Sequence, residues 1–272
     1  MKEDILTKII ANKRKEISRQ MEDVSIKSIK NMIDICGIDE HQSLSRSIIS
    51  SHTGIISEFK RRSPSKGWIN QKADVKNIAS GYAEAGVAGL SVLTDIDFFG
   101  GSKGDLIKAR FAAPSTPILR KDFIISEYQI LQSVAIQADA ILLIAAALEK
   151  DECKHLAEMA HSFGLEVLLE VHSENELDYV TDCIDLIGVN NRNLGSFHTD
   201  VENSFRLAEK LPEGIPHISE SGISGADTIT ALRQAGYNGF LMGESFMRTE
   251  NPAYALKVLI EELETASMNE KS

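Results

Sequence analysis

The chain has 272 residues, of which 43% are hydrophobic and 25% are charged, and its formal net charge is −11. This composition is typical of a soluble globular protein with a large core, and the length suits an α/β barrel. The acidic balance argues against general nucleic-acid affinity, and no apolar run reaches the roughly 20 residues that span a bilayer, so neither nucleic acid nor membrane is expected as a partner.

The N-terminal sequence MKEDILTKIIANKRKEISRQ has acidic residues early and no long apolar stretch, so it is not a secretory signal. Cys36, Cys153 and Cys183 lie far apart and lack metal-ligand spacing, which favours reduced thiols. We therefore expect a cytoplasmic protein.

Residues 1–53 stand apart from the pattern of the remaining chain. The segment ILTKIIANKRKEISRQ (5–20) has the apolar spacing of an amphipathic helix, and polar, poorly periodic sequence follows it. We predict an N-terminal helical extension packed on residues 54–265, so that 1–272 form a single domain.

From Gly54 onward, short apolar runs alternate with amphipathic segments. The predicted strands are 54–60, 89–95, 116–122, 140–146, 166–171, 186–191, 216–221 and 239–245. The predicted helices are 74–86, 104–112, 126–137, 150–164, 173–182, 199–211, 225–236 and 252–265. Eight strands alternating with eight helices predict an α/β fold, a (β/α)8 TIM barrel. An open doubly wound sheet is the alternative, but SPSKG after the first strand is not the glycine-rich fingerprint GxGxxG.

Charged and amide side chains gather where these strands end. Because alternate residues of a strand share a face, Glu58 lies on the side of Ile56, Glu170 on that of Leu168, and Glu220 on that of Ile218. In a barrel such ends meet at one mouth. The residues at these ends are Glu58, Lys60, Lys121, Glu170, Asn190, Arg192, Glu220 and Ser221. Burying single charges would be costly, so a cluster of ammonium and carboxylate groups predicts acid/base catalysis, with ion pairing at the rim as the structural alternative.

The seventh and eighth strands end in SESG and MGES, whose small residues let backbone N–H groups approach an anion. We predict a phosphate site there. Phe98 and Phe99 either pack in the core or supply one wall of a site for an aromatic substrate, and Phe123 could supply the second wall. The scattered histidines form no ligand pattern, so we expect no metal.

Taken in order, seven motifs resemble the indole-3-glycerol phosphate synthase family. They are SEFKRRSPSKG, SVLTD with FFGGS, PILRKDFI, LLEVH, IGVNNRNL, SESGI and MGESFM. The resemblance covers nearly the whole chain, including the N-terminal extension. It implies a carboxy-lyase of tryptophan biosynthesis. Such an enzyme closes, decarboxylates and dehydrates 1-(2-carboxyphenylamino)-1-deoxyribulose 5-phosphate to indole-3-glycerol phosphate.

The family pattern also implies roles for particular residues. Lys121 resembles the general acid of ring closure, Glu170 and Lys60 the acid/base pair of dehydration, and Glu58 the group that orients the lysines. Asn190, Glu220 and Ser221 resemble substrate-positioning residues of the catalytic site. Substrate contacts are expected from Ser63, Phe99, Phe123 and Arg192, and phosphate contacts from Gly222, Gly243, Glu244 and Ser245.

Glu244 is a departure, because a neutral small residue is also familiar at that position. We expect its carboxylate to turn away from the phosphate, leaving the backbone amide as donor. The resemblance implies no cofactor, and we expect a monomer that binds a small phosphorylated molecule.

Two rival interpretations are weaker. Phosphoribosylanthranilate isomerase, a related barrel, would need a cysteine on the first strand, where this chain has EFK. A non-catalytic phosphometabolite-binding barrel would be expected to lack at least one of Glu58, Lys60, Lys121 and Glu170, and all are present.

Overall fold

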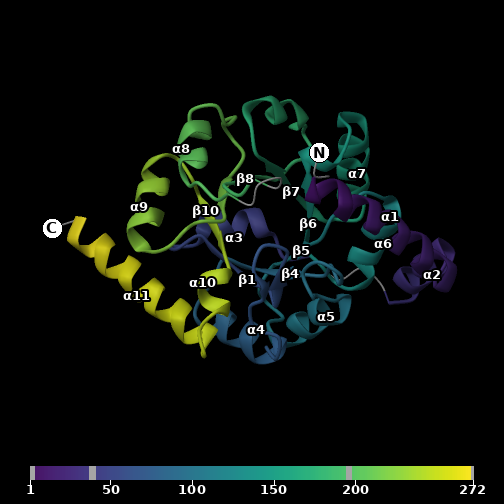
Figure 1. The fold of residues 1–272 in the computed structure, drawn as a ribbon, viewed down its shortest axis with the longest axis horizontal. Coiled ribbons are helices and arrows are strands. Elements are labelled where there is room, and N and C mark those ends of the chain that lie inside the picture. The colour runs from purple at the N-terminus through teal and green to yellow at the C-terminus, as the bar shows by residue number, and fades with distance from the viewer. Residues whose placement is uncertain (1–3, 37–40, 194–197, 271–272) are drawn as a thin grey trace.

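The computed structural model describes residues 4–36, 41–193 and 198–270, and its centre is a closed barrel of parallel strands (Figure 1). The strands, in chain order, are β1 (Ile55–Phe59), β4 (Gly89–Leu93), β5 (Ile118–Lys121), β6 (Ala140–Ile144), β7 (Glu166–Val171), β8 (Leu186–Asn190), β9 (His217–Glu220) and β10 (Gly239–Met242). Each pairs with the next, and β1 closes the barrel against β10. The predicted (β/α)8 barrel and its strands are confirmed.

Helices cover the outside of this barrel. They are α4 (Val75–Glu84), α5 (Lys103–Ala112), α6 (Glu127–Ala135), α7 (Lys150–Ser162), α8 (Glu202–Ala208), α9 (Ala226–Gln234) and α11 (Pro252–Glu270). The four-residue α10 (Glu244–Met247) and the 3-10 helix η1 (Ala145–Ala147) follow strand ends, and β2 (Arg62–Ser63) pairs with β3 (Gly67–Trp68) in the first loop.

The helix predicted over 173–182 is wrong, because that segment forms only the 3-10 helix η2 (Glu174–Tyr179). None of its residues is fully buried, so no apolar stripe holds a longer α-helix against the barrel.

The N-terminal extension contains more helix than the periodicity indicated. After α1 (Ile5–Asp23) come α2 (Ile26–Cys36) and α3 (Leu44–Ser50), where irregular structure was expected. The hydroxyl of Ser43 caps α3 by accepting the N–H of Arg46. α1 and α2 lie beside α6, while α11 occupies the opposite side of the barrel (Figure 1).

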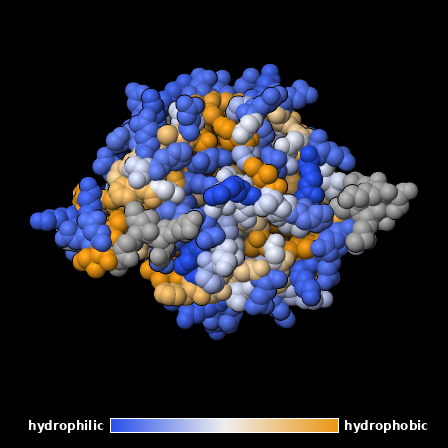
Figure 2. Space-filling model, turned by 180° about the vertical axis from the view of Figure 1, so that it is seen from behind, coloured by the Kyte–Doolittle hydropathy of each residue, from blue (hydrophilic) through white to orange (hydrophobic). Residues whose placement is uncertain are grey.

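Strand alternation divides the buried residues into two cores. Ile56, Leu168 and Ile218 belong to the inner core, whereas Ile55 and Val167 pack outward against the helices. The predicted inward faces are therefore confirmed. Hydrophilic side chains cover most of the outer surface that Figure 2 shows, and within the described residues no helix is both long and apolar enough to cross a membrane.

α3 closes the amino-terminal end of the barrel. Leu44 is fully buried, and a Cβ added to Gly89 would lie 2.4 Å from its Cδ1, so the missing side chain of the glycine leaves room for it. The carboxylate of Glu166, at the start of β7, accepts hydrogen bonds from the Ser43 and Ser45 hydroxyls at 2.5 and 2.8 Å. The extension is therefore part of the barrel core at this end.

Leu44→Ala should lower the free energy of unfolding by about 2–5 kcal/mol, because it leaves a cavity where α3 closes the barrel. Ile49→Ala on the same helix is the matched control, since Ile49 is 66% exposed. Urea denaturation of both variants measures the difference. Equal losses of stability would contradict the closing role of Leu44.

Candidate active site

A pocket of about 770 Å³ opens at the carboxyl ends of the barrel strands. All seven residues predicted to be catalytic line it: Glu58, Lys60, Lys121, Glu170, Asn190, Glu220 and Ser221. The convergence that the strand alternation predicted is therefore observed.

Lys121 forms the centre of the charged cluster. Its Nζ lies 2.5 Å from Oε2 of Glu220 and 3.1 Å from Oε2 of Glu170, so the ends of β5, β7 and β9 are joined by one ammonium. Both carboxylates are almost fully buried. Removing the lysine would leave them without their shared counter-charge, a strongly unfavourable arrangement.

This environment shifts three pKa values. Burial opposes the charge on Lys121, but Glu220, Glu170 and Glu58 outweigh it and raise the pKa of that ammonium. Burial likewise opposes ionisation of Glu170, yet Lys121 and His172 lower its pKa. For Glu220, burial and the charge of Glu170 outweigh Lys121, and its pKa is raised. Lys121 is therefore held as an ammonium and Glu170 as a carboxylate, whereas Glu220 is the carboxyl that readily accepts a proton.

Two glycines make this crowding possible. A Cβ added to Gly188 on β8 would lie 2.2 Å from Oε1 of Glu220, and one on Gly243 would lie 2.6 Å from Cβ of Glu58. Next to Gly243, Nζ of Lys60 lies 2.6 Å from Oε1 of Glu58. A larger residue at either glycine would push a carboxylate away from its ammonium partner.

The rim after β9 and β10 is suited to an anion. Gly222, Gly243, Glu244 and Ser245, the predicted phosphate residues, all line the pocket. Ser221 and Gly222 have φ angles of 69° and 76°, a left-handed turn that strains a serine and suits a glycine. Lys66 and Arg248 also line this rim, although neither was singled out from the sequence.

The carboxylate of Glu244 points towards two arginines. Its Oε2 lies 3.2 Å from Nη2 of Arg192, and its Oε1 lies 3.1 Å from Nη2 of Arg248. Burial opposes its ionisation, but Arg192, Lys60 and Arg248 lower its pKa. The carboxylate thus pairs with two guanidinium groups that could otherwise bind an anion.

An apolar wall faces the charged cluster. The rings of Phe99 and Phe123 line the pocket, with centroids 5.9 Å apart. Leu142 and Ile144 of β6 line it beside them. Phe98 is not among the lining residues and packs against the inner core instead. Phe99 packs against the same core and, in addition, forms part of the pocket wall.

Ser63, which the resemblance predicts to contact the substrate, lies in the first loop of the barrel. It is fully buried in β2, its hydroxyl accepts the N–H of Lys66, and it does not line the pocket. Ser65 and Lys66, further along the same loop, line the pocket in its place. The β2–β3 hairpin turns Ser63 inward, a local geometry that the sequence SPSKG did not reveal.

The chain is similar to known proteins over nearly its whole length. The family model described as indole-3-glycerol phosphate synthase matches residues 6–259. Indole-3-glycerol phosphate synthase of Bacteroides thetaiotaomicron is 53% identical over 254 residues, which cover 93% of this chain and 96% of that protein. Its namesake in Burkholderia lata is 42% identical over 260 residues, covering 93% and 97%.

Among solved structures, 3-hexulose-6-phosphate synthase from Salmonella typhimurium matches with a TM-score of 0.60 at 10% identity. The match covers 77% of this chain and 99% of that one. At such low identity this likeness shows the shared fold alone.

Glu220→Gln should change the pH dependence of stability. A carboxyl whose pKa is raised by folding loses stability as pH rises from the unfolded to the folded value, and glutamine does not. Between about pH 5 and pH 8, the free energy of unfolding of the variant relative to wild type should therefore rise by ~1 kcal/mol, which raises its relative thermal midpoint by roughly 2–4 °C.

Differential scanning calorimetry across that range measures this effect. Glu262→Gln, on the exposed face of α11, is the control and should follow the wild type throughout. Parallel curves for Glu220→Gln and wild type would show that Glu220 ionises as freely in the folded chain as in the unfolded one.

Proposed function

Since the chain belongs to the indole-3-glycerol phosphate synthase family, we propose that it converts 1-(2-carboxyphenylamino)-1-deoxyribulose 5-phosphate to indole-3-glycerol phosphate in tryptophan biosynthesis. The observation that carries this proposal is the layout of one pocket, with an aromatic wall, a buried acid/base cluster and an anion-binding rim. These three parts match the aromatic ring, the reacting ketone and the phosphate of that substrate.

The layout orients the substrate. The anilino ring packs against Phe99 and Phe123, and the phosphate receives the backbone N–H groups of the rim beside Gly222, Gly243 and Ser245. The sugar chain then spans the mouth of the barrel, which brings its ketone towards Lys121. Fixing both ends of the substrate holds the ring carbon near the ketone carbon, so that less conformational entropy is lost when the two carbons react.

Ring closure uses Lys121 as general acid. The ring carbon that bears the carboxylate attacks the ketone carbon, and the ketone oxygen takes a proton from the ammonium. The raised pKa keeps Lys121 protonated at neutral pH, so the acid is present before the substrate arrives. The same shift makes it a weaker acid, and displacement of a carboxylate by the ketone oxygen would restore its strength. CO2 then leaves, and the electron pair of the broken bond restores the aromatic ring.

Dehydration uses the neighbouring groups. The new hydroxyl leaves as water with a proton from Lys60, and Glu170 removes the proton whose loss completes the indole double bond. The lowered pKa of Glu170 keeps it ionised for this task. Glu58 orients Lys60 through their 2.6 Å contact. Asn190, Ser221 and Arg192 position the sugar hydroxyls and the phosphate.

The two rivals lack this support. β1 supplies Glu58, and Lys60 directly follows this strand, but this segment has no cysteine for an isomerase base. A barrel that only binds phosphometabolites does not require three buried carboxylates around an ammonium, a costly arrangement without a chemical use. We also propose that the protein works as a single-domain cytoplasmic monomer, without cofactor or metal.

The purified protein should form an indole product from this substrate without added metal, and Lys121→Ala should lower kcat by about a hundred- to ten-thousand-fold. Appearance of indole fluorescence measures turnover. Lys154→Ala, on the exposed surface of α7, is the control and should keep wild-type rates. The alanine variant should still fold and bind substrate, and unimpaired turnover would refute the role of Lys121.

Glu244→Gln should tighten binding of inorganic phosphate by about fivefold, or ~1 kcal/mol, because Arg192 and Arg248 lose a competing carboxylate. Inhibition of turnover by phosphate gives the constant, with Glu262→Gln as control. Weaker inhibition in the variant would mean that Glu244 holds the arginines in the binding geometry.

A further inference from the structure

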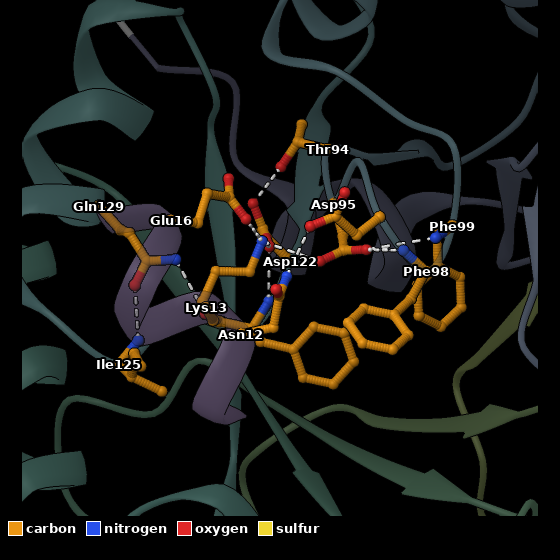
Figure 3. A network of polar contacts seen from close by, with 12 residues as sticks. Asn12, Lys13, Glu16, Thr94, Asp95, Phe98, Phe99, Asp122, Ile125 and Gln129 are labelled. Atoms are coloured by element: carbon orange, nitrogen blue, oxygen red, sulfur yellow. Dashed lines mark hydrogen bonds and ion pairs between the residues drawn. The ribbon is translucent and has the colours of Figure 1, made fainter. Parts of the chain in front are cut away.

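A lysine of the N-terminal extension is buried beside the active site. Lys13 of α1 is 1% exposed, and its Nζ lies 2.8 Å from Oδ2 of Asp95, 3.0 Å from Oδ1 of Asp122 and 2.7 Å from Oε2 of Glu16 (Figure 3). Asp95 and Asp122 are themselves buried. They follow the ends of β4 and β5, so one ammonium joins the extension to two barrel loops.

The charge on Lys13 is firmly held. Burial opposes it, but Asp122 and Asp95 outweigh burial and raise the pKa of the ammonium. Arg120 provides a second buried cation, with Nη2 3.0 Å from Oδ2 of Asp122. Without Lys13, therefore, Asp95 would lose its cation and Asp122 would keep only Arg120.

Asp95 holds the loop that carries one half of the aromatic wall. Its Oδ1 accepts the backbone N–H groups of Phe98 and Phe99 at 2.8 and 3.2 Å, and its backbone oxygen accepts the N–H of Gly101 at 2.8 Å. The position of this carboxylate therefore determines where the chain leaves β4 and where the ring of Phe99 lies.

Asp122 holds the other half. It directly follows Lys121, and its Oδ1 accepts the N–H of Phe123 at 2.9 Å. Its Oδ2 accepts the hydroxyl of Thr94 at 2.6 Å, which ties the end of β5 to that of β4. Phe123 supplies the second ring of the wall, so the two aspartates around Lys13 fix both rings and the backbone beside Lys121.

Attachment of the extension does not explain a buried lysine. Leu6 and Ile9 of α1 already pack in the inner core with Phe123, and an apolar residue at position 13 would add to that packing without burying a charge. Unlike an apolar side chain, the ammonium of Lys13 attracts the carboxylates of Asp95 and Asp122 and thereby fixes their positions. Asn12 adds a further contact to the same loop through Oδ2 of Asp97 at 2.7 Å.

We propose that Lys13 is a positioning residue of the active site, which holds Phe99, Lys121 and Phe123 in place through Asp95 and Asp122. The extension is then a working part of the substrate pocket. The consequence for turnover rests on the proposed function, whereas the placement of the loop does not.

Lys13→Met is the direct test. With the loop after β4 released, KM for the anilino-deoxyribulose phosphate should rise at least tenfold, and kcat should fall by a smaller factor. Glu16→Gln is the matched control, because it removes the partner of Lys13 that holds neither wall residue. That variant should keep the wild-type KM.

Fluorescence of Trp68 provides a readout independent of turnover. Trp68 is the only tryptophan of the chain, and a Cβ on Gly100 would lie 2.9 Å from its ring, so the indole rests on the loop that Asp95 holds. Below the melting temperature, Lys13→Met should shift the emission maximum, whereas Glu16→Gln should not. If the wild type showed no turnover, the proposed function would fail. The Trp68 spectrum would still test whether Lys13 positions the loop after β4.

Lys13→Met/Asp95→Asn covers the case in which the single variant does not fold. It removes the unpaired charge of Asp95 and should fold, while KM and the Trp68 spectrum stay altered because no ammonium of α1 joins the two loops. A folded variant of either kind with wild-type KM and a wild-type spectrum would overturn the proposal.

Discussion

The candidate active site depends on one buried ammonium shared by carboxylates from different strands. Lys121 binds Glu170 and Glu220 across the mouth of the barrel, and these contacts compensate for removing three charges from water. Burial, together with the charge of Glu170, raises the pKa of Glu220, so this carboxyl is able to take up a proton. The same arrangement that keeps the charged groups buried therefore also gives them acid/base character.

The rest of the barrel makes room for this cluster. Gly188 and Gly243 have no side chain where carboxylates of neighbouring strands must pass, and at the amino-terminal end Gly89 leaves space for Leu44. Apolar packing fills the lower layers of the barrel, and the charged groups that line the pocket from the strands come from the last residue or two of those strands. The charged pocket thereby opens at one end of the barrel.

The N-terminal extension contributes at both ends of the barrel. α3 closes the amino-terminal end with Leu44 and Ile48, and α1 reaches the carboxyl end with Lys13. The extension is bound by core packing in one place and by buried ion pairs in the other. This arrangement explains why it stays on the barrel, and the ion pairs place it beside the aromatic wall.

The sequence alone determined the barrel and most of its mouth. Strand alternation carries inward-facing residues such as Glu58, Glu170 and Glu220 to one end, and that periodicity is local. Only the tertiary structure decided the meaning of Lys13, which in sequence is one more basic residue of an amphipathic helix, because its partner Asp95 is more than eighty residues away. The inward turn of Ser63 and the seating of α3 were likewise decided by contacts between distant segments. The local periodicity of the sequence determines on which face of a strand or helix a residue lies. Long-range packing determines which residues that face contacts.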